Sequence, residues 1–201
     1  MANQHSEKPV LTKAWRDDIN RALEVLNSGG LILYPTDTIW GIGCDATNPA
    51  AVERVFALKQ RSDSKALISL VDSDAKVQFY VRDVPAVAWD VIDYATRPLT
   101  IIYDGARNLA PNLLAADGSA ALRITQEPFS HELCFRFRRA IVSTSANVSG
   151  EPAPQCFDDI ADEIKNGVDY VCTSRRNEHG PAKASSILKI GTGGIVDIIR
   201  R

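Results

Sequence analysis

A chain of 201 residues with 45% apolar and 24% charged content is long enough to bury a core, which excludes disordered and fibrous classes. The formal net charge of −2 argues against a surface devoted to wrapping nucleic acid, although a local basic cleft stays possible. No apolar run approaches the ~20 residues that span a bilayer, and the N-terminus lacks the apolar core of a signal peptide. We therefore expect a cytoplasmic protein with no membrane segment.

The predicted helices and strands alternate along the chain, which favours an α/β architecture in a single domain over residues 1–201. Gly29-Gly30 predicts the end of the first helix, and Asn48-Pro49 predicts the start of the second. Helices are predicted near residues 14–28, 49–60, 84–95, 128–138 and 157–166. Strands are predicted at residues 31–34, 67–71, 99–103, 120–125, 140–143, 168–172, 185–190 and 195–199. The last two strands resemble a hairpin, so the sheet is predicted to be mixed.

The four cysteines are scattered, with no Cys-x-x-Cys pair and no histidine at ligand spacing. We expect reduced, mostly structural thiols, and the sequence identifies no metal site. Residues 173–184 form a polar, basic stretch without periodicity, predicted to be a mobile loop.

Thr36, Asp37 and Thr38, with Gly41 and Gly43, form the first candidate site. The pattern fits a turn between two strands, and it equally fits hydroxyls and backbone amides that bind a small polar ligand. Neither the spacing of a Walker A loop nor that of a Rossmann fingerprint is present.

Three cations, Lys59, Arg61 and Lys65, form the second candidate site at the predicted end of a helix. Such a cluster is often a solvated face favoured by the helix dipole. The alternative is a phosphate clamp, because arginine offers a planar fork and lysine a point charge to phosphate oxygens.

The third candidate site is the hydroxyl-rich run Ser143–Asn147, with Ser149-Gly150, directly after a predicted strand. Alternation along an extended backbone would put Ser143 and Ser145 on one side. A helix cap or turn is the alternative. No Gly-x-Ser-x-Gly elbow accompanies these serines, so we expect no covalent protein nucleophile.

Together these runs make the chain resemble the YrdC-type family, in particular its single-domain threonylcarbamoyl-AMP synthases. The ordered motifs are residues 34–45, Lys59-Gln60-Arg61 with Lys65, Leu99-Thr100, Leu122-Arg123-Ile124, residues 143–150 and Ser185-Ser186-Ile187. The resemblance covers about residues 15–200. It implies a twisted mixed sheet, flanked by helices, around a positively charged cavity. The chain departs from the family at Ala95-Thr96-Arg97-Pro98, where Trp-Pro-Gly-Pro is usual, and at Ala153, where a serine is usual.

The resemblance implies an enzyme, a nucleotidyltransferase that condenses L-threonine, bicarbonate or carbon dioxide, and ATP into threonylcarbamoyl-AMP and pyrophosphate. By the same resemblance, threonine would be bound by Thr38, Arg123, Ser143 and Ser185. ATP would be bound by Lys59, Arg61, Lys65, Ser119, Ser145 and Arg200, and Thr36 and Asn147 would be secondary. ATP would enter as a substrate, with Mg²⁺ as the expected accompanying ion.

The implied partners are tRNA-modification proteins of the TsaD/TsaB/TsaE type, which would transfer the threonylcarbamoyl group to adenosine 37 of tRNA, with RNA contact also possible. The main alternative is a non-catalytic YciO-type RNA-binding or translation-associated protein. The intact Lys-x-Arg cluster favours the synthase, since that paralogue tends to lack it. A carbamoyl-transfer module of hydrogenase maturation is disfavoured, because zinc-finger cysteines are absent.

Overall fold

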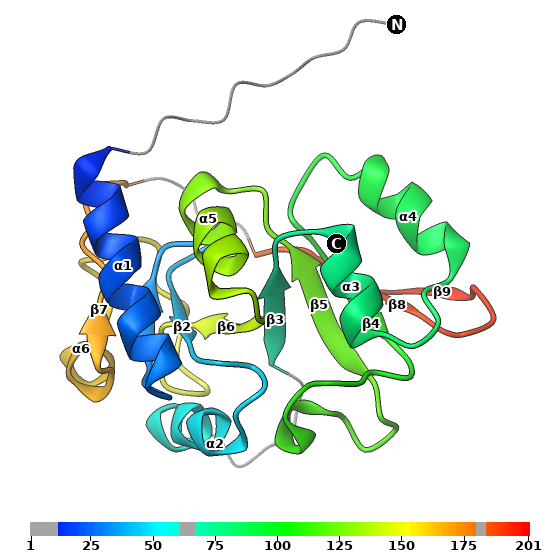
Figure 1. The fold of residues 1–201 in the computed structure, drawn as a ribbon, viewed down its shortest axis with the longest axis horizontal. Coiled ribbons are helices and arrows are strands. Elements are labelled where there is room, and N and C mark those ends of the chain that lie inside the picture. Colours follow the sequence, from blue (N-terminus) through cyan, green and yellow to red (C-terminus); the bar gives the residue numbers. More distant parts are fainter. Residues whose placement is uncertain (1–11, 61–66, 180–183) are drawn as a thin grey trace, which may run out of the picture.

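The computed structural model describes residues 12–60, 67–179 and 184–201 (Figure 1). Its helices are α1 (Lys13–Asn27), α2 (Pro49–Leu58), α3 (Asp74–Tyr80), α4 (Ala86–Asp93), α5 (Pro128–Phe137) and α6 (Asp162–Gly167), with a 3₁₀ turn η1 (Pro111–Leu113). Its strands are β1 (Ile32–Tyr34), β2 (Gly41–Gly43), β3 (Ile68–Val71), β4 (Leu99–Tyr103), β5 (Ala120–Ile124), β6 (Ile141–Ser145), β7 (Tyr170–Val171), β8 (Ser186–Ile190) and β9 (Val196–Arg200).

These strands form one mixed sheet in the order β7-β1-β2-β6-β3-β5-β4-β8-β9. Parallel pairs join β1 to β7, β3 to β5 and β4 to β8, while the other neighbours run antiparallel. The α/β class, the mixed sheet and the terminal hairpin predicted from the sequence are confirmed.

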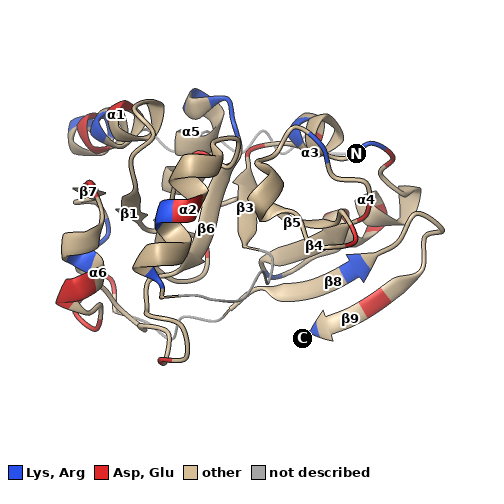
Figure 2. Cartoon of the chain, turned by 90° about the horizontal axis from the view of Figure 1, so that it is seen from below, with Lys and Arg blue, Asp and Glu red and all other residues tan. Residues whose placement is uncertain are grey.

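One face of the sheet carries α1, α5 and α3 side by side (Figure 2). In α1, Ile19, Ala22 and Leu26 recur at helical spacing and are fully buried. The hydroxyl of Thr12 caps this helix by accepting from the amide of Trp15. The Trp15 ring then packs edge-on against Phe129 of α5, at 5.7 Å between centroids. The two helices therefore share one apolar layer over the central strands.

Packing favours glycine at two positions of β2. A Cβ at Gly43 would lie 2.6 Å from Tyr34 Cε1, and one at Gly41 would lie 3.2 Å from Ser143 Oγ. A side chain at Gly43 would force its neighbours to move, whereas one at Gly41 would need Ser143 to shift by only a few tenths of an ångström. This reason differs from the predicted one, close approach of a ligand, and it holds the first and third candidate sites against each other.

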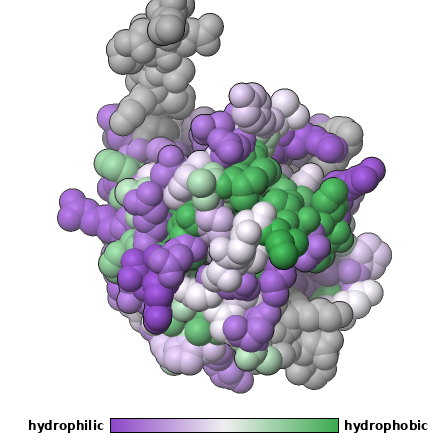
Figure 3. All heavy atoms as spheres, turned by 90° about the vertical axis from the view of Figure 1, so that its right-hand side faces the viewer, coloured by the Kyte–Doolittle hydropathy of each residue, from purple (hydrophilic) through white to green (hydrophobic). Residues whose placement is uncertain are grey.

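The last strand, β9, lies at the edge of the sheet and is exposed along its whole length. Figure 3 shows apolar side chains gathered on the side of the molecule that carries α4 and the β8–β9 hairpin. The large apolar side chains exposed in and next to this hairpin are Ile195, Val196, Ile198 and Ile199. A bulge interrupts the pairing of β8 and β9, a common way to blunt an exposed edge. Arg200, predicted to bind ATP, is therefore carried by the outermost strand.

One predicted helix boundary is wrong, and one helix was missed. The helix expected over residues 157–166 begins only at Asp162, because Asp159 instead accepts from the amides of Gln155 and Cys156, and the Phe157 ring packs against Trp40. The short helix α3 was not predicted, since it buries only Val77 and Tyr80 and so lacks a long periodic pattern.

Gly29 has φ +79° just after α1, as the predicted helix end requires, and Asn48 caps α2 by accepting from two amides.

None of the helices in the described parts of the chain combines the length and apolar character needed to cross a membrane.

Candidate functional site

A cavity of about 280 Å³ opens on the sheet where the turn after β1 meets β3, β5, β6, β8 and β9. It is lined by Thr38, Ile39, Gly41, Leu67, Ile68, Arg123, Ser143, Thr144, Ser145, Ala153, Ala184, Ser185, Ile187 and Arg200. Six residues predicted from the sequence therefore line a single cavity: Thr38, Arg123, Ser143, Ser145, Ser185 and Arg200.

The strand register explains why these residues meet. Ile68 of β3 lies opposite Ser143 of β6 on one side and opposite Ala121 of β5 on the other. Side chains two positions apart on a strand share a face, so Ser145 joins Ser143 and Arg123 joins Ala121. The predicted alternation of Ser143 and Ser145 thus brings both hydroxyls to the cavity.

Arg123 provides the buried positive charge of the cavity, with only 3% of its side chain exposed. Its Nη2 lies 2.9 Å from Oδ1 of Asp37 and 3.4 Å from Oγ1 of Thr38. Burial raises the pKa of Asp37, whereas the charge of Arg123 opposes that shift. The Nε atom of Arg123 is buried and has no hydrogen-bond acceptor. Oδ1 of Asp37 likewise has no hydrogen-bond donor, so the two charges lie close together without a hydrogen bond between them.

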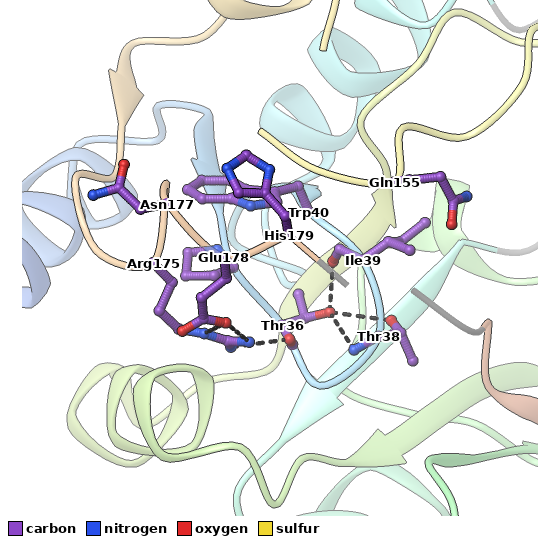
Figure 4. Close-up of a pocket in the computed structure, with 10 residues that line it drawn as sticks. Thr36, Thr38, Ile39, Trp40, Gln155, Arg175, Asn177, Glu178 and His179 are labelled. Atoms are coloured by element: carbon purple, nitrogen blue, oxygen red, sulfur yellow. Dashed lines mark hydrogen bonds and ion pairs between the residues drawn. The ribbon is translucent and has the colours of Figure 1, made fainter. Parts of the chain in front are cut away.

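A second cavity, of about 560 Å³, adjoins the first and shares Thr38 and Ile39 with it (Figure 4). In Figure 4, Thr36, Thr38 and Arg175 approach the same turn. Arg175 Nη1 donates to the carbonyl of Thr36 and pairs with Glu127, at 3.1 and 3.0 Å. Arg175 has φ +60°, a conformation that non-glycine residues adopt rarely. This arginine fixes the backbone that presents Thr38.

Residues 173–179, which with Ala184 are the described part of the predicted mobile loop, are anchored to α1. Asp18 is buried and accepts hydrogen bonds from the amides of Thr173 and Ser174 and from the hydroxyl of Tyr170, at 2.7 to 3.0 Å. Arg176 donates to the carbonyls of Val171 and Cys172. Motion of the whole 173–184 segment stays a prediction, and residues 180–183 lie outside the described residues.

On the predicted nucleotide side, Arg200 donates from Nε to the carbonyl of Ser185 at 2.9 Å and contacts its hydroxyl at 3.4 Å. Lys59 is 2% exposed, and its Nζ donates to the carbonyls of Ser145 and Asn147, both at 2.6 Å. Arg61 and Lys65 lie outside the described residues, so their predicted place in this wall stays a prediction.

Four of the predicted residues that the structure describes do not line this cavity: Thr36, Lys59, Ser119 and Asn147. Ser119 precedes β5 at its opposite end, and its hydroxyl donates to Asp117 at 2.6 Å. The amide of Asn147 donates to the carbonyls of Val148 and Glu151, which shapes the turn after β6. The predicted role of Ser119 with ATP and the secondary role of Asn147 stay predictions.

The thiols offer no nucleophile in this region. Cys44, Cys134 and Cys172 are buried, and burial raises the pKa of each thiol well above its usual value. Among the described residues, no group of three or more histidine, cysteine, aspartate or glutamate side chains could hold a metal ion.

Comparison with known proteins places the chain in a family. A model of the Sua5/YciO/YrdC family, described as "Telomere recombination", matches residues 24–201, and the chain belongs to this family. Curated relatives include threonylcarbamoyl-AMP synthases from Hahella chejuensis (35% identity; 89% of this chain and 96% of the relative) and Pseudomonas fluorescens (30% identity; 92% and 98%).

Solved structures agree on the fold. E. coli YciO matches with a TM-score of 0.78 at 21% identity, over 93% of this chain and 89% of that one. P. abyssi Sua5 complexed with L-threonine matches with a TM-score of 0.77 at 22% identity, over 89% of this chain. The chain spans about half of the P. abyssi Sua5 chain (52%). At such identities the likeness establishes the fold alone.

Sequence reasoning assigned no role to Asp37, although the residue lies within the first candidate site. The available signal was a charge argument: Arg123 is the sole cation in an apolar strand and must be paired when buried. Arg175 and Asp18 gave no comparable signal, because they act through backbone groups.

Proposed function

We propose that this protein is a threonylcarbamoyl-AMP synthase that joins L-threonine, bicarbonate or carbon dioxide, and ATP into threonylcarbamoyl-AMP and pyrophosphate. One observation carries the proposal: residues that the family resemblance assigns to two different substrates line one cavity, with the serine run between them. The family match and the synthases among the relatives support the same activity.

Arg123 is the natural partner for the threonine carboxylate. Its Nη2 is held by Asp37, while its buried Nε–H has no acceptor. A substrate carboxylate that accepts from Nε would complete the hydrogen bonds of the guanidinium. Ser143 and Ser185, on either side of the cavity, would add hydroxyl contacts.

The reaction requires two anions, the threonine carbamate and ATP, to be bound next to each other. The threonine amine attacks the carbon of carbon dioxide and loses a proton, which gives a carbamate. A carbamate oxygen then attacks the α-phosphorus of ATP, the bond from that phosphorus to the bridging oxygen breaks, and pyrophosphate leaves. No protein nucleophile takes part, so the contribution of the chain is to hold both reactants in reach and in line.

The nucleotide side would offset the phosphate charge with Arg200 and with Arg61 and Lys65, the latter two by resemblance. Ser145 would offer its hydroxyl. Since the described residues contain no metal cage, Mg²⁺ would be held mainly by phosphate oxygens and water, as is usual for this ion. It would neutralise phosphate charge there.

The product is a reactive mixed anhydride, which water hydrolyses. We infer that it passes to tRNA-modification proteins of the TsaD/TsaB/TsaE type for transfer to adenosine 37 of tRNA. This step rests on the family resemblance.

The test is release of pyrophosphate by the purified protein. We expect release from ATP only when both threonine and bicarbonate are supplied. Omission of either, and substitution of threonine by alanine, are the controls. Release independent of threonine would contradict the proposal. Absent release together with tight binding of duplex RNA would favour the YciO-type alternative.

A further inference from the structure

The hydroxyl of Thr36 makes three contacts in the turn between β1 and β2. Its Oγ1 lies 2.7 Å from the carbonyl oxygen of Ile39, 3.1 Å from the amide nitrogen of Thr38 and 3.1 Å from Oγ1 of Thr38 (Figure 4). Thr36 is buried, with 4% of its surface exposed. These contacts use the one proton and two lone pairs that a hydroxyl possesses.

The direction of each hydrogen bond follows from counting protons. The Ile39 carbonyl can only accept, so the Thr36 hydroxyl donates to it. The amide of Thr38 can only donate, so Thr36 accepts there. The remaining contact between the two hydroxyls must then use the proton of Thr38.

Thr38 consequently presents only lone pairs to the cavity. Its proton points at Thr36, and the neighbouring Nη2 of Arg123, 3.4 Å away, is itself a donor. A ligand atom that contacts Thr38 must therefore be a hydrogen-bond donor. A carboxylate cannot take this position, whereas an amine can.

We propose that Thr36 is a positioning residue that makes Thr38 a fixed acceptor, and that this acceptor selects the substrate by its α-amine. The inference rests on the proposed function and names the recognition element of its amino-acid site. With the carboxylate on Arg123, the α-amine is the donor closest to Thr38, because it is attached to the carbon next to the carboxylate. The side-chain hydroxyl of threonine is one atom further away.

The arrangement also suits the reaction. A donor at Thr38 would occupy the nitrogen lone pair that must attack carbon dioxide, whereas an acceptor engages an N–H bond and leaves the lone pair free. The carbamate nitrogen keeps one N–H after carboxylation. Thr38 therefore holds the same hydrogen bond before and after that step.

The experiment compares Thr36→Val, which keeps the shape but removes the hydroxyl, with Thr36→Ser, which keeps the hydroxyl. Inhibition and binding constants are measured for L-threonine, 2-aminobutyrate, which lacks the side-chain hydroxyl, and 3-hydroxybutyrate, which lacks the amine. In the natural protein we expect loss of the amine to weaken binding more than loss of the hydroxyl.

In Thr36→Val, Thr38 is free to rotate and to donate. We expect threonine binding to weaken about tenfold, the size of one hydrogen bond in a buried site, and the preference for threonine over 3-hydroxybutyrate to shrink by a similar factor. KM for ATP should change less than about twofold, and Thr36→Ser should restore the preference.

Equal preference in Thr36→Val and the natural protein would overturn the inference, as would equal losses in the valine and serine variants. Thermal unfolding reports whether each variant folds, and Thr36→Ala removes the same hydroxyl if valine is not accommodated. If the natural protein turns over threonine but the preference for threonine over 3-hydroxybutyrate is the same in the variants, only this inference is refuted. A natural protein that neither binds nor uses threonine refutes the proposed function.

Discussion

The two sides of the cavity hold their cations in different ways. On the side proposed for the amino acid, Arg123 is buried against the carboxylate of Asp37, so one side chain orients another. On the side proposed for the nucleotide, Arg200 donates to a main-chain carbonyl and belongs to an exposed edge strand, and Lys59, which does not line the cavity, also donates to main-chain carbonyls. A buried, oriented pair suits selection of a small ligand by its hydrogen-bonding groups. Cations tied to the main chain suit attraction of a highly charged ligand.

The largest effect is expected from Arg123→Lys, which keeps the charge and loses the fork. A hydrogen bond between charged groups contributes about 1.5–3 kcal/mol, so loss of the guanidinium contact to the threonine carboxylate should lower kcat/KM for threonine at least about tenfold. Steady-state pyrophosphate release with varied threonine measures it. Arg97→Lys is the matched control, because Arg97 does not line this cavity; it lines a neighbouring groove between α4 and the sheet, which Asp37 also reaches. An unchanged kcat/KM in Arg123→Lys would contradict the proposed role of Arg123 in binding threonine.

A smaller effect should separate the two serines of β6. Ser143→Ala should raise KM for threonine, and Ser145→Ala should raise KM for ATP, each about five- to tenfold as one hydrogen bond is lost. The measurement is initial rate with each substrate varied in turn. Both variants remove one hydroxyl from the same strand, so each controls for the other. Parallel shifts in both KM values would mean that the cavity has no division between substrates.

The smallest effect concerns Asp117, which lies outside the cavity and binds Ser119 and Lys189. The hydrogen bond from Lys189, followed by those from Ser119, lowers the pKa of Asp117. A carboxyl with a lowered folded pKa adds stability above its unfolded pKa of about 3.9, and loses it as the pH falls through the folded value. Asp117→Asn should therefore reduce the unfolding temperature slightly at pH 7 and converge with the natural protein in acid.

The same variant tests whether Ser119 takes part in ATP binding. If this hydroxyl serves only Asp117, KM for ATP in Asp117→Asn should remain within about twofold of the natural value, because a surface contact far from the ligand contributes little. A large rise in KM for ATP would support the predicted role of Ser119 in binding ATP.

The family resemblance assigned Thr38, Arg123, Ser143, Ser145 and Ser185 to the two substrates, and the structure brings these residues to one cavity. Strand alternation by itself predicted only that Ser143 and Ser145 share a face. Pairing between distant segments could not be deduced in this way. The ion pair of Asp37 with Arg123 depends on the shape of one turn, and that shape depends on Arg175 and the carbonyl of Thr36.

Residues that bind backbone groups were the least predictable. The assignment of Lys59 to the nucleotide stays a prediction, and the sequence did not indicate that its Nζ donates to two carbonyls at the end of β6. Asp18 holds amides far away in the sequence, and any acidic residue of α1 fits the helical pattern equally well. Backbone amides and carbonyls occur at every position, so the sequence does not mark the ones that a side chain will reach.

The burial of Lys59 affects whether this lysine can be modified by the product of the reaction. A synthase of this kind would hold an acylating mixed anhydride beside its own lysines, and an exposed amine there would be at risk of self-modification. Lys59 directs N–H bonds at two carbonyl oxygens and is almost sealed from solvent, so it contributes positive charge without offering a nucleophile. Structural use of this lysine thereby protects the enzyme from its product.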